Sequence, residues 1–349
     1  MAGILYIAYP LLPVSDQSCG GAEQVLHTLE AEMFARGHRT TVAACDGSRV
    51  TGELLAIGPP PVADDHLAER QEALHQKVLA ALRSRSFDLI HDHSGALWQH
   101  AHEASVPVLA TLHLPRRMYP RELFANIAPN VSFNCVSASQ ARDFRDLPNL
   151  AGVVENGIAL ERFPLTAEKG DYLLWLGRVC VEKGAHLAIE AAERAQLPLV
   201  LAGQVYPFAY HRRYFAECVE PHIARHDVRW VERPALAEKL ELLRRARAVL
   251  LPSLVDETSS LVALEAWACG TPVIAFRRGA LAQLVRPGVN GFLVETAEEM
   301  AGASRRAGEL EPAACRGSVE GKYTAERMAD GYAGLHERLA RRPQLSSAA

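Results

Sequence analysis

Two glutamates eight residues apart, Glu257 and Glu265, lie in the stretch of sequence with the most potential for chemistry. This stretch begins with an apolar run at 249–251, which predicts a buried strand, and continues through a polar loop into a helix. In open α/β sheets ligands bind beyond the carboxyl ends of the strands. We therefore expect the loop to face a binding crevice.

The start of the expected helix suits a phosphate group, because the first N–H groups of a helix have no partners within it. The helix should begin near Ser259 or Ser260. Glu265 then lies a little over one turn inside, where its carboxylate can accept hydrogen bonds from a ribose diol. Glu257 precedes the helix and points at whatever is attached beyond the phosphates. The N–H groups expected to meet the phosphates are those of Ser260, Leu261 and Val262.

These residues also have a purely structural explanation, in which Ser259 caps the helix, Glu257 is solvated and Glu265 forms a surface ion pair. Composition alone favours that explanation, since glutamates are common on protein surfaces. Two glutamates by themselves do not decide between the alternatives.

A second loop, with Arg178 and Lys183, also follows an expected strand, at 172–176, and leads into a helix from Ala185. Gly177 should permit a tight turn there. Lys183 is one of five lysines in the chain, so its position is not explained by abundance. Two cations at the end of a strand can neutralise a diphosphate leaving group, where one preorganised donor contributes roughly 3 to 4 kcal/mol. Taken alone, they are equally explained as exposed basic residues.

Short apolar runs alternate with helical periodicity along the chain, which is typical of βαβ units and parallel sheets. The expected strands are 4–9, 40–45, 89–92, 108–112 and 131–136 in the first half, and 172–176, 199–202, 228–231, 249–251 and 273–275 in the second. A chain of 349 residues exceeds the usual size of one core. The sequence therefore predicts two Rossmann-like α/β domains, at 1–160 and 161–324, followed by a helix and a frayed tail within 325–349.

The two loops are parts of a longer pattern. Gly-Arg-x4-Lys-Gly at 177–184, followed by Glu-x7-Glu-Ala-x-Ala-x-Gly-x-Pro-Val at 257–273, resembles the carboxyl half of the retaining glycosyltransferases of family four, of bacterial type. Further segments extend the resemblance over nearly the whole chain: the glycine-rich loop at 20–23, Asp-Leu-Ile-His-Asp-His-Ser at 88–94, Asn-Gly-Ile at 156–158 and Gly-x-x-Gly-Phe-Leu-Val at 288–294.

The resemblance implies the GT-B fold, with a donor and acceptor cleft between the two domains. It also implies transfer of a sugar, with retention, from a nucleotide diphosphate sugar to an acceptor hydroxyl. Carried over position by position, the catalytic residues are His113, Arg178, Lys183 and Glu257. The donor-binding residues are Gly20, Gly21, Gly177, Arg178, Lys183, Arg233, Thr258, Ser259, Ser260, Leu261, Val262 and Glu265, and the acceptor-side residues are Ser94 and Asn156. Ser259-Ser260 departs from the aromatic-Gly pair common in the family, and Ala159 replaces its usual aspartate.

We expect neither a metal ion nor a cofactor. The run His91-Asp92-His93 has metal-ligating side chains, but alternation along a strand puts the histidines on one face and the aspartate on the other. A polar strand end is therefore the preferred interpretation. The chain contains no Asp-x-Asp, which is consistent with protein cations doing the work of a divalent ion.

Charge and hydropathy restrict the partners. The net charge of −4 lacks the basic excess of a nucleic-acid-binding protein, and no apolar run is long enough to span a bilayer. We expect a cytoplasmic protein whose partners are a nucleotide-sugar donor and an unidentified hydroxyl acceptor. Peripheral membrane contact stays open.

Three other functions share the two-domain plan. A nucleotide-sugar epimerase needs no acceptor, a sugar phosphorylase uses inorganic phosphate in its place, and an inactive protein only binds the nucleotide sugar. The joint presence of Arg178, Lys183, Glu257 and Glu265 disfavours the inactive protein. A nicotinamide dehydrogenase is disfavoured because no Gly-x-Gly-x-x-Gly follows the first strand of either half.

Overall fold

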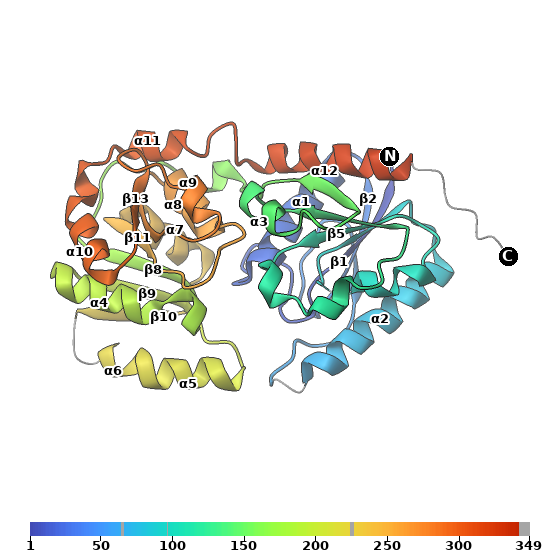
Figure 1. Ribbon diagram of the computed structural model, residues 1–349, viewed down its shortest axis with the longest axis horizontal. Coiled ribbons are helices and arrows are strands. Elements are labelled where there is room, and N and C mark those ends of the chain that lie inside the picture. The colour runs from blue at the N-terminus through green and yellow to red at the C-terminus, as the bar shows by residue number, and fades with distance from the viewer. Residues whose placement is uncertain (64–65, 96, 224–226, 342–349) are drawn as a thin grey trace. The chain divides into compact units, whose positions relative to one another are not determined.

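The computed structural model describes residues 1–63, 66–95, 97–223 and 227–341. The chain forms two compact units. The N-terminal unit comprises residues 1–156 and the residues from 325 onward, and the C-terminal unit comprises residues 157–324 (Figure 1). Residues 342–349, for which the sequence predicts a frayed tail, lie outside the described residues.

A seven-stranded parallel sheet forms the centre of the N-terminal unit, with the strand order β3-β2-β1-β4-β5-β6-β7. The strands are β1 (Gly3–Ile7), β2 (Arg39–Ala44), β3 (Glu53–Ala56), β4 (Leu89–Asp92), β5 (Val108–Leu112), β6 (Val131–Cys135) and β7 (Leu150–Val153). Strand order reverses between β1 and β4. This is the topological switch point, where open α/β sheets bind their ligands.

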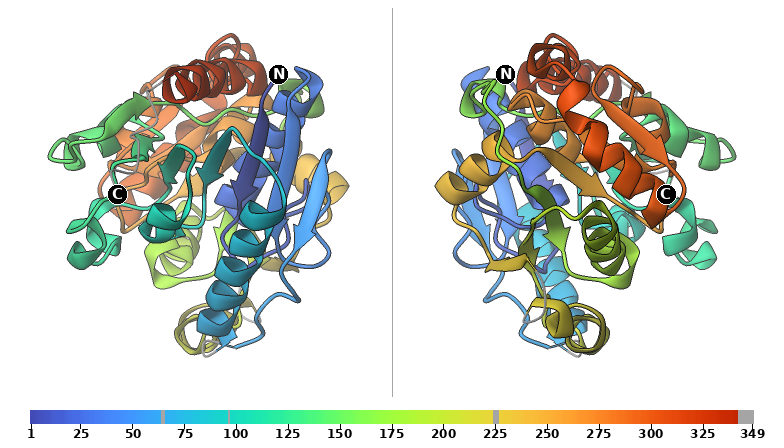
Figure 2. Two further views of the ribbon diagram at one scale, coloured as in Figure 1. Left: turned by 90° about the vertical axis from the view of Figure 1, so that its right-hand side faces the viewer. Right: turned by 90° about the vertical axis from the view of Figure 1, so that its left-hand side faces the viewer.

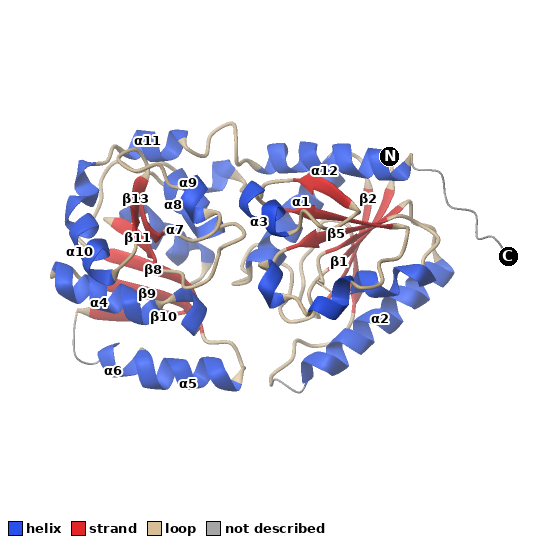
Figure 3. Cartoon of the chain, in the orientation of Figure 1, coloured by secondary structure: helices blue, strands red, loops and turns tan. Residues whose placement is uncertain are grey.

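Helices cover both faces of this sheet (Figures 2 and 3). The helical elements are α1 (Gly21–Ala35), α2 (His66–Ser84), η1 (Leu97–Glu103), η2 (Arg116–Met118), η3 (Arg121–Phe124), α3 (Ala138–Asp143) and α12 (Ala325–Ala340). On one face, α2 contributes Leu74, Val78 and Ala81 to the core under the strands. Their spacing of four and three residues is that of a helix with one apolar face.

Helix α12 follows the C-terminal unit in sequence but packs against α1 in the N-terminal unit. Met328, Tyr332, Leu335 and Leu339 are buried on its inner face. The Tyr332 hydroxyl accepts a hydrogen bond from Asn134 Nδ2 at 3.2 Å. The chain therefore returns to complete the core of its first unit.

The C-terminal unit has a six-stranded parallel sheet of the order β10-β9-β8-β11-β12-β13, whose switch point lies between β8 and β11. The strands are β8 (Leu173–Arg178), β9 (Leu199–Gln204), β10 (Val228–Glu232), β11 (Ala248–Leu251), β12 (Val273–Phe276) and β13 (Gly291–Val294). The helical elements are η4 (Leu160–Arg162), η5 (Val181–Lys183), α4 (Ala185–Ala195), α5 (Ala209–Cys218), α6 (Glu220–Ile223), α7 (Leu236–Arg245), α8 (Leu261–Ala268), α9 (Leu281–Leu284), α10 (Ala297–Arg306), η6 (Ala307–Glu309) and α11 (Pro312–Gly317).

Alternation along β8 divides the core of the C-terminal unit into two layers. Leu173 and Trp175 pack under α4 and α10, whereas Leu174 and Leu176 pack under α7 and α8. Both sets are apolar because helices cover both faces of a parallel sheet. Among the described residues, no helix combines the length and apolar character needed to cross a membrane.

Candidate active site

The predicted donor-binding residues of the C-terminal unit follow strands that lie side by side at its switch point. Arg178 ends β8, and Lys183 ends the short η5 that follows. Glu257 lies in the loop between β11 and α8. Strands β8 and β11 are paired in parallel, so their carboxyl ends meet at one edge.

Lys183 and Glu257 form an ion pair across this switch point, with Nζ 2.6 Å from Oε1. Ser253 Oγ donates a hydrogen bond to the same carboxylate oxygen. The Glu257 side chain is 11% exposed and that of Lys183 is 32% exposed, so the pair is partly shielded from water. The backbone supports it, because Leu254 N donates to Glu182 O at 2.9 Å and ties the two loops together.

The loop after β8 turns at Gly184, not at Gly177. Gly184 has φ +65°, and a Cβ there would lie 2.2 Å from Pro252 O. The prediction of a tight turn at Gly177 is wrong, because this residue lies within β8 and pairs with Gly203. A Cβ on Gly203 would lie 1.8 Å from Gly177 O, so the two glycines permit close approach of the strands.

Helix α8 begins after Ser260, whose hydroxyl accepts a hydrogen bond from Ala263 N at 3.3 Å. The cap is therefore Ser260, and the structural explanation that assigned this role to Ser259 is wrong. The N–H groups of Leu261 and Val262 lie in the first turn, with Thr258 and Ser259 in the loop before it. The loop between β12 and α9 also contacts Glu257, since Ala280 N donates a hydrogen bond to Glu257 O at 2.6 Å.

Glu265 lies within α8 and is buried, with 3% of the residue exposed. Its Oε1 is 2.6 Å from the Nζ of Lys239, a residue of α7. Its Oε2 is buried without a hydrogen-bond partner among the described residues. Glu265 therefore forms a buried ion pair, not the surface pair of the structural explanation.

Lys239 was missed in the sequence. A single basic residue near the start of an amphipathic helix is common and does not stand out. Its partner Glu265 lies 26 residues later in another helix, so local sequence does not connect the two. The available signal was scarcity, because Lys239 is another of the five lysines. That criterion had already directed attention to Lys183.

Arg178 is the last residue of β8, and Arg233 follows β10, which is separated from β8 by β9 in the same sheet. The Arg178 guanidinium lies 5.4 Å from the ring centre of Tyr206. Burial acts to lower the pKa of Arg178, but the neighbouring Cys180 and Tyr206 raise it above its usual value, so the group stays charged. Arg233 follows β10 with φ +49°, a left-handed conformation uncommon outside glycine, and its N donates to Gly203 O at 2.7 Å.

The predicted residues of the N-terminal unit also follow neighbouring strands. Helix α1 begins at Gly21 with Gly20 as its N-cap, after β1. A Cβ on Gly20 would lie 1.9 Å from Oε2 of the Glu23 side chain, which would have to move aside. Ser94 follows β4, and its hydroxyl accepts a hydrogen bond from Leu97 N. Asn156 is buried as the last residue before the C-terminal unit, and its Oδ1 is without a partner among the described residues.

His113 follows β5 and pairs with a second buried histidine. His93 Nδ1 and His113 Nε2 are 2.9 Å apart. Burial lowers the pKa of His113 to about 4, so its imidazole is neutral at neutral pH. A neutral imidazole can both donate and accept a hydrogen bond.

The alternation predicted for His91-Asp92-His93 is confirmed. The rings of His91 and His93 lie on one face, with centres 4.2 Å apart. Asp92 points to the other face, where its carboxylate accepts hydrogen bonds from Ser94 N at 2.7 Å and Trp98 N at 2.8 Å. Asp92 thereby fixes the start of η1.

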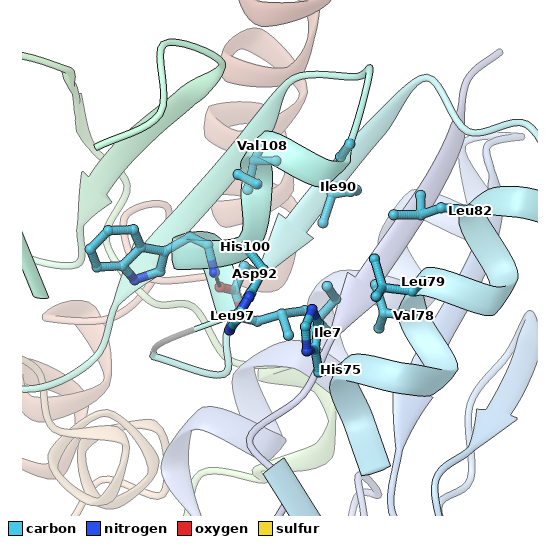
Figure 4. A pocket seen from close by; sticks show the side chains of 13 residues that line it. Ile7, His75, Val78, Leu79, Leu82, Ile90, Asp92, Leu97, His100 and Val108 are labelled. Atoms are coloured by element: carbon cyan, nitrogen blue, oxygen red, sulfur yellow. Dashed lines mark hydrogen bonds between the residues drawn. The ribbon is translucent and has the colours of Figure 1, made fainter. Parts of the chain in front are cut away.

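The pocket in Figure 4 lies on the Asp92 face of the N-terminal unit, between α2, η1 and the sheet. It encloses about 20 Å³ and is lined mainly by apolar residues such as Ile7, Val78 and Ile90. A cavity of this size holds about one water molecule. It does not hold a nucleotide sugar.

Comparison with known proteins agrees with this geometry. Residues 19–162 match the family model described as Glycosyltransferase Family 4, and residues 170–308 match that described as Glycosyl transferases group 1. A glycogen synthase of Mycobacterium tuberculosis is 31% identical, covering 82% of this chain and 81% of its own length. The chain belongs to glycosyltransferase family 4. A second relative, the D-inositol 3-phosphate glycosyltransferase of Jonesia denitrificans, is 29% identical over 62% of this glycosyltransferase and 61% of its own length.

Solved structures confirm the predicted fold. Sucrose-phosphate synthase from Thermosynechococcus elongatus superposes with a TM-score of 0.78 at 21% identity, covering 97% of this glycosyltransferase and 99% of the other chain. Anabaena HepE, solved in complex with UDP-glucose, gives a TM-score of 0.78 at 18% identity, covering 97% and 100%. The two Rossmann-like α/β units are those of GT-B glycosyltransferases. The relatives named glycogen synthase and D-inositol 3-phosphate glycosyltransferase support glycosyl transfer as the activity of this family member.

Proposed function

We propose that this glycosyltransferase moves a sugar from a nucleoside diphosphate sugar to an acceptor hydroxyl, with retention at the anomeric carbon and without a divalent cation. The observation that carries the proposal is the Lys183–Glu257 ion pair, at the switch point of a parallel sheet and beside the start of α8. HepE, which has a similar fold, was solved in complex with UDP-glucose, and this supports a donor of the same class.

In the proposed reaction the anomeric C–O bond to the phosphate breaks, and a bond forms from the acceptor oxygen to the same carbon. The acceptor proton moves to the departing phosphate oxygen, so that no separate base is needed. Negative charge grows on the diphosphate as the bond breaks. Arg178, Lys183 and the first N–H groups of α8 oppose that charge, which lowers the barrier because the charge is larger in the transition state.

Glu257 and Glu265 have different proposed roles. Glu257 orients the Lys183 ammonium in the absence of a donor and contacts the donor sugar when one binds. Glu265 Oε2 accepts a hydrogen bond from a ribose hydroxyl, which would satisfy its buried oxygen. His113 lies beside the reacting sugar as a neutral imidazole.

A nucleotide-binding panel tests the donor class. The purified protein is heated with UDP, GDP, ADP, dTDP, NAD or NADH, in EDTA and then with Mg²⁺, because a ligand of the folded state raises the unfolding temperature. We expect one nucleoside diphosphate to stabilise the protein in EDTA. Glu265→Ala should abolish the shift, whereas Glu217→Ala, a change at an exposed position of α5, should keep it. Stabilisation only by the dinucleotides, or only with Mg²⁺, would contradict the proposal.

A further inference from the structure

A group of two histidines and a glutamate lies apart from the proposed donor site, in the N-terminal unit. His75 comes from α2, and His100 and Glu103 come from η1. One ligand atom from each of the three side chains lies within 4.8 Å of the others. Imidazole nitrogens with one carboxylate oxygen form a common ligand set for Zn²⁺.

The local structure explains why these side chains converge. In a 3₁₀ helix, residues i and i+3 eclipse, so His100 and Glu103 share one edge of η1. Trp98 and Ala101, also three apart, are buried on another edge and hold η1 against the sheet. His75 follows the buried Leu74 of α2, which packs on the same layer of the core.

The distances match those of a tetrahedral metal site. His75 Nε2 lies 3.1 Å and His100 Nδ1 lies 3.5 Å from the same oxygen, Glu103 Oε1. Ligand atoms bound tetrahedrally to Zn²⁺ at about 2.0 to 2.1 Å stand about 3.3 Å apart. These two separations lie close to that value, and the remaining pair of ligand atoms, from His75 and His100, lies within 4.8 Å.

The surroundings leave room for a further ligand. A cavity of about 270 Å³ borders His75 and His100 and is lined by polar residues that include Gln71, Glu72 and Gln99. Figure 4 shows both histidines at the adjoining pocket. Water or a small anion in the cavity can complete the coordination.

We infer that His75, His100 and Glu103 form a site for a divalent transition metal of the Zn²⁺ class. The site links α2 to η1. Imidazole ligands select Zn²⁺, Co²⁺ or Ni²⁺ over Mg²⁺ and Ca²⁺, which prefer oxygen ligands. None of the three residues is among the proposed donor-binding residues, and all three belong to α2 and η1.

Metal binding to the full chain, without an affinity tag and after removal of metal with EDTA, tests this site. We expect one Zn²⁺ per chain by calorimetry. His75→Ala, His100→Ala and Glu103→Gln should each weaken it by more than about 10-fold, because even changes in outer-shell partners cost about 10- to 100-fold. His66→Ala, at the start of the same helix, should bind like the unaltered protein.

Unfolding temperatures and the absorption spectrum of bound Co²⁺ distinguish loss of this site from misfolding and from binding to cysteine. In EDTA, the unfolding temperatures of the variants should equal that of the unaltered protein, which excludes misfolding as the cause of lost binding. Co²⁺ should give the visible absorption of a four-coordinate nitrogen and oxygen site, without the thiolate bands that binding to cysteine would produce. Absence of Zn²⁺ binding to the unaltered protein, or equal binding by the three variants, would overturn the inference.

Discussion

Glu265 shows how a single buried carboxylate can be prepared for a ligand. Its Oε1 is neutralised by Lys239, and its Oε2 is without a partner among the described residues. Burial of a charged pair costs several kcal/mol per ion before the ions attract each other, and native proteins leave few buried polar atoms unsatisfied. An unsatisfied oxygen beside the start of α8 is therefore where a ribose hydroxyl would gain the most.

We predict that Lys239→Met destabilises the protein by about 3 kcal/mol, because it leaves the Glu265 charge buried without its cation. The double variant Lys239→Met/Glu265→Gln should recover part of that loss. Arg245→Met, which removes exposed pairs with Glu168 and Glu241, should cost under about 1 kcal/mol. Urea unfolding measures all three, and equal effects of Lys239→Met and Arg245→Met would show that the pair is not buried in solution.

For single residues, the sequence predicts those that directly follow a recognisable strand. Lys183 and Glu257 follow apolar runs, and the ends of strands paired at a switch point must meet. Lys239 could not be found in this way, since its partner lies in another helix. Gly177 was misinterpreted because a Gly-Arg pair after an apolar run has the same letters whether the strand continues or turns.

The loops after β8 and β11 lie close together, and a backbone contact at Gly184 helps to position Lys183 and Glu257. The approach of Gly184 to Pro252 O holds the loop after β8 against the loop after β11. Lys183 is the residue before this glycine. The left-handed conformation of Gly184 therefore lies next to the residue whose ammonium pairs with Glu257.

We predict that Gly184→Ala destabilises the protein by roughly 1 to 3 kcal/mol and lowers donor turnover, because its Cβ meets Pro252 O and its φ is unfavourable. Gly302→Ala provides the matched control. A Cβ there meets nothing within 4 Å in α10, so it should stabilise the protein by about 0.5 to 1 kcal/mol. Thermal unfolding and donor turnover distinguish the two, and unchanged turnover in Gly184→Ala would separate this turn from catalysis.

The elements with the strongest patterns were predicted. All ten strands expected from the sequence are present, with ends within about two residues. The strands β3, β7 and β13 were missed because they are only partly buried, whereas β4, β11 and β12 have the same four-residue length but are buried throughout. Helix α2 was missed although Leu74, Val78 and Ala81 have helical spacing, because many charged and polar residues surround these three.

At the scale of the molecule, α12 completes the N-terminal unit with polar contacts as well as apolar ones. His336 Nε2 lies 3.2 Å from His91 Nδ1, and the Tyr332 hydroxyl contacts both Thr111 and Asn134. Together with His93 and His113 they form a buried network. Sequence periodicity identified the apolar face of the helix, but it could not show that His336 belongs to this face.

This network makes stability depend on pH. Burial, with His38 nearby, lowers the pKa of His336 to about 3. In the unfolded state His336 takes up a proton near pH 6.5, whereas in the folded state it stays neutral until about pH 3. The free energy of unfolding therefore falls as the pH drops below about 6.5. At pH 5 this one group should account for about 2 kcal/mol.

We predict that His336→Gln reduces the loss of unfolding free energy between pH 7 and pH 5 by about 2 kcal/mol, whatever its effect at pH 7. His66→Gln, at the first residue of α2, is the control and should leave the pH dependence unchanged. Urea unfolding at the two pH values measures both differences. A pH dependence that His336→Gln does not alter would mean that His336 is protonated in the folded protein.

The most direct test of a metal-free donor site is the release of nucleoside diphosphate from the nucleotide sugar that the binding panel selects, with water as acceptor and EDTA present. We predict that the unaltered enzyme works equally well in EDTA and in Mg²⁺. Lys183→Ala should lower kcat by about 100- to 1000-fold with little change in KM, because its charge is needed most in the transition state. Turnover that requires Mg²⁺, or a Lys183→Ala variant with unchanged kcat, would contradict the proposed mechanism.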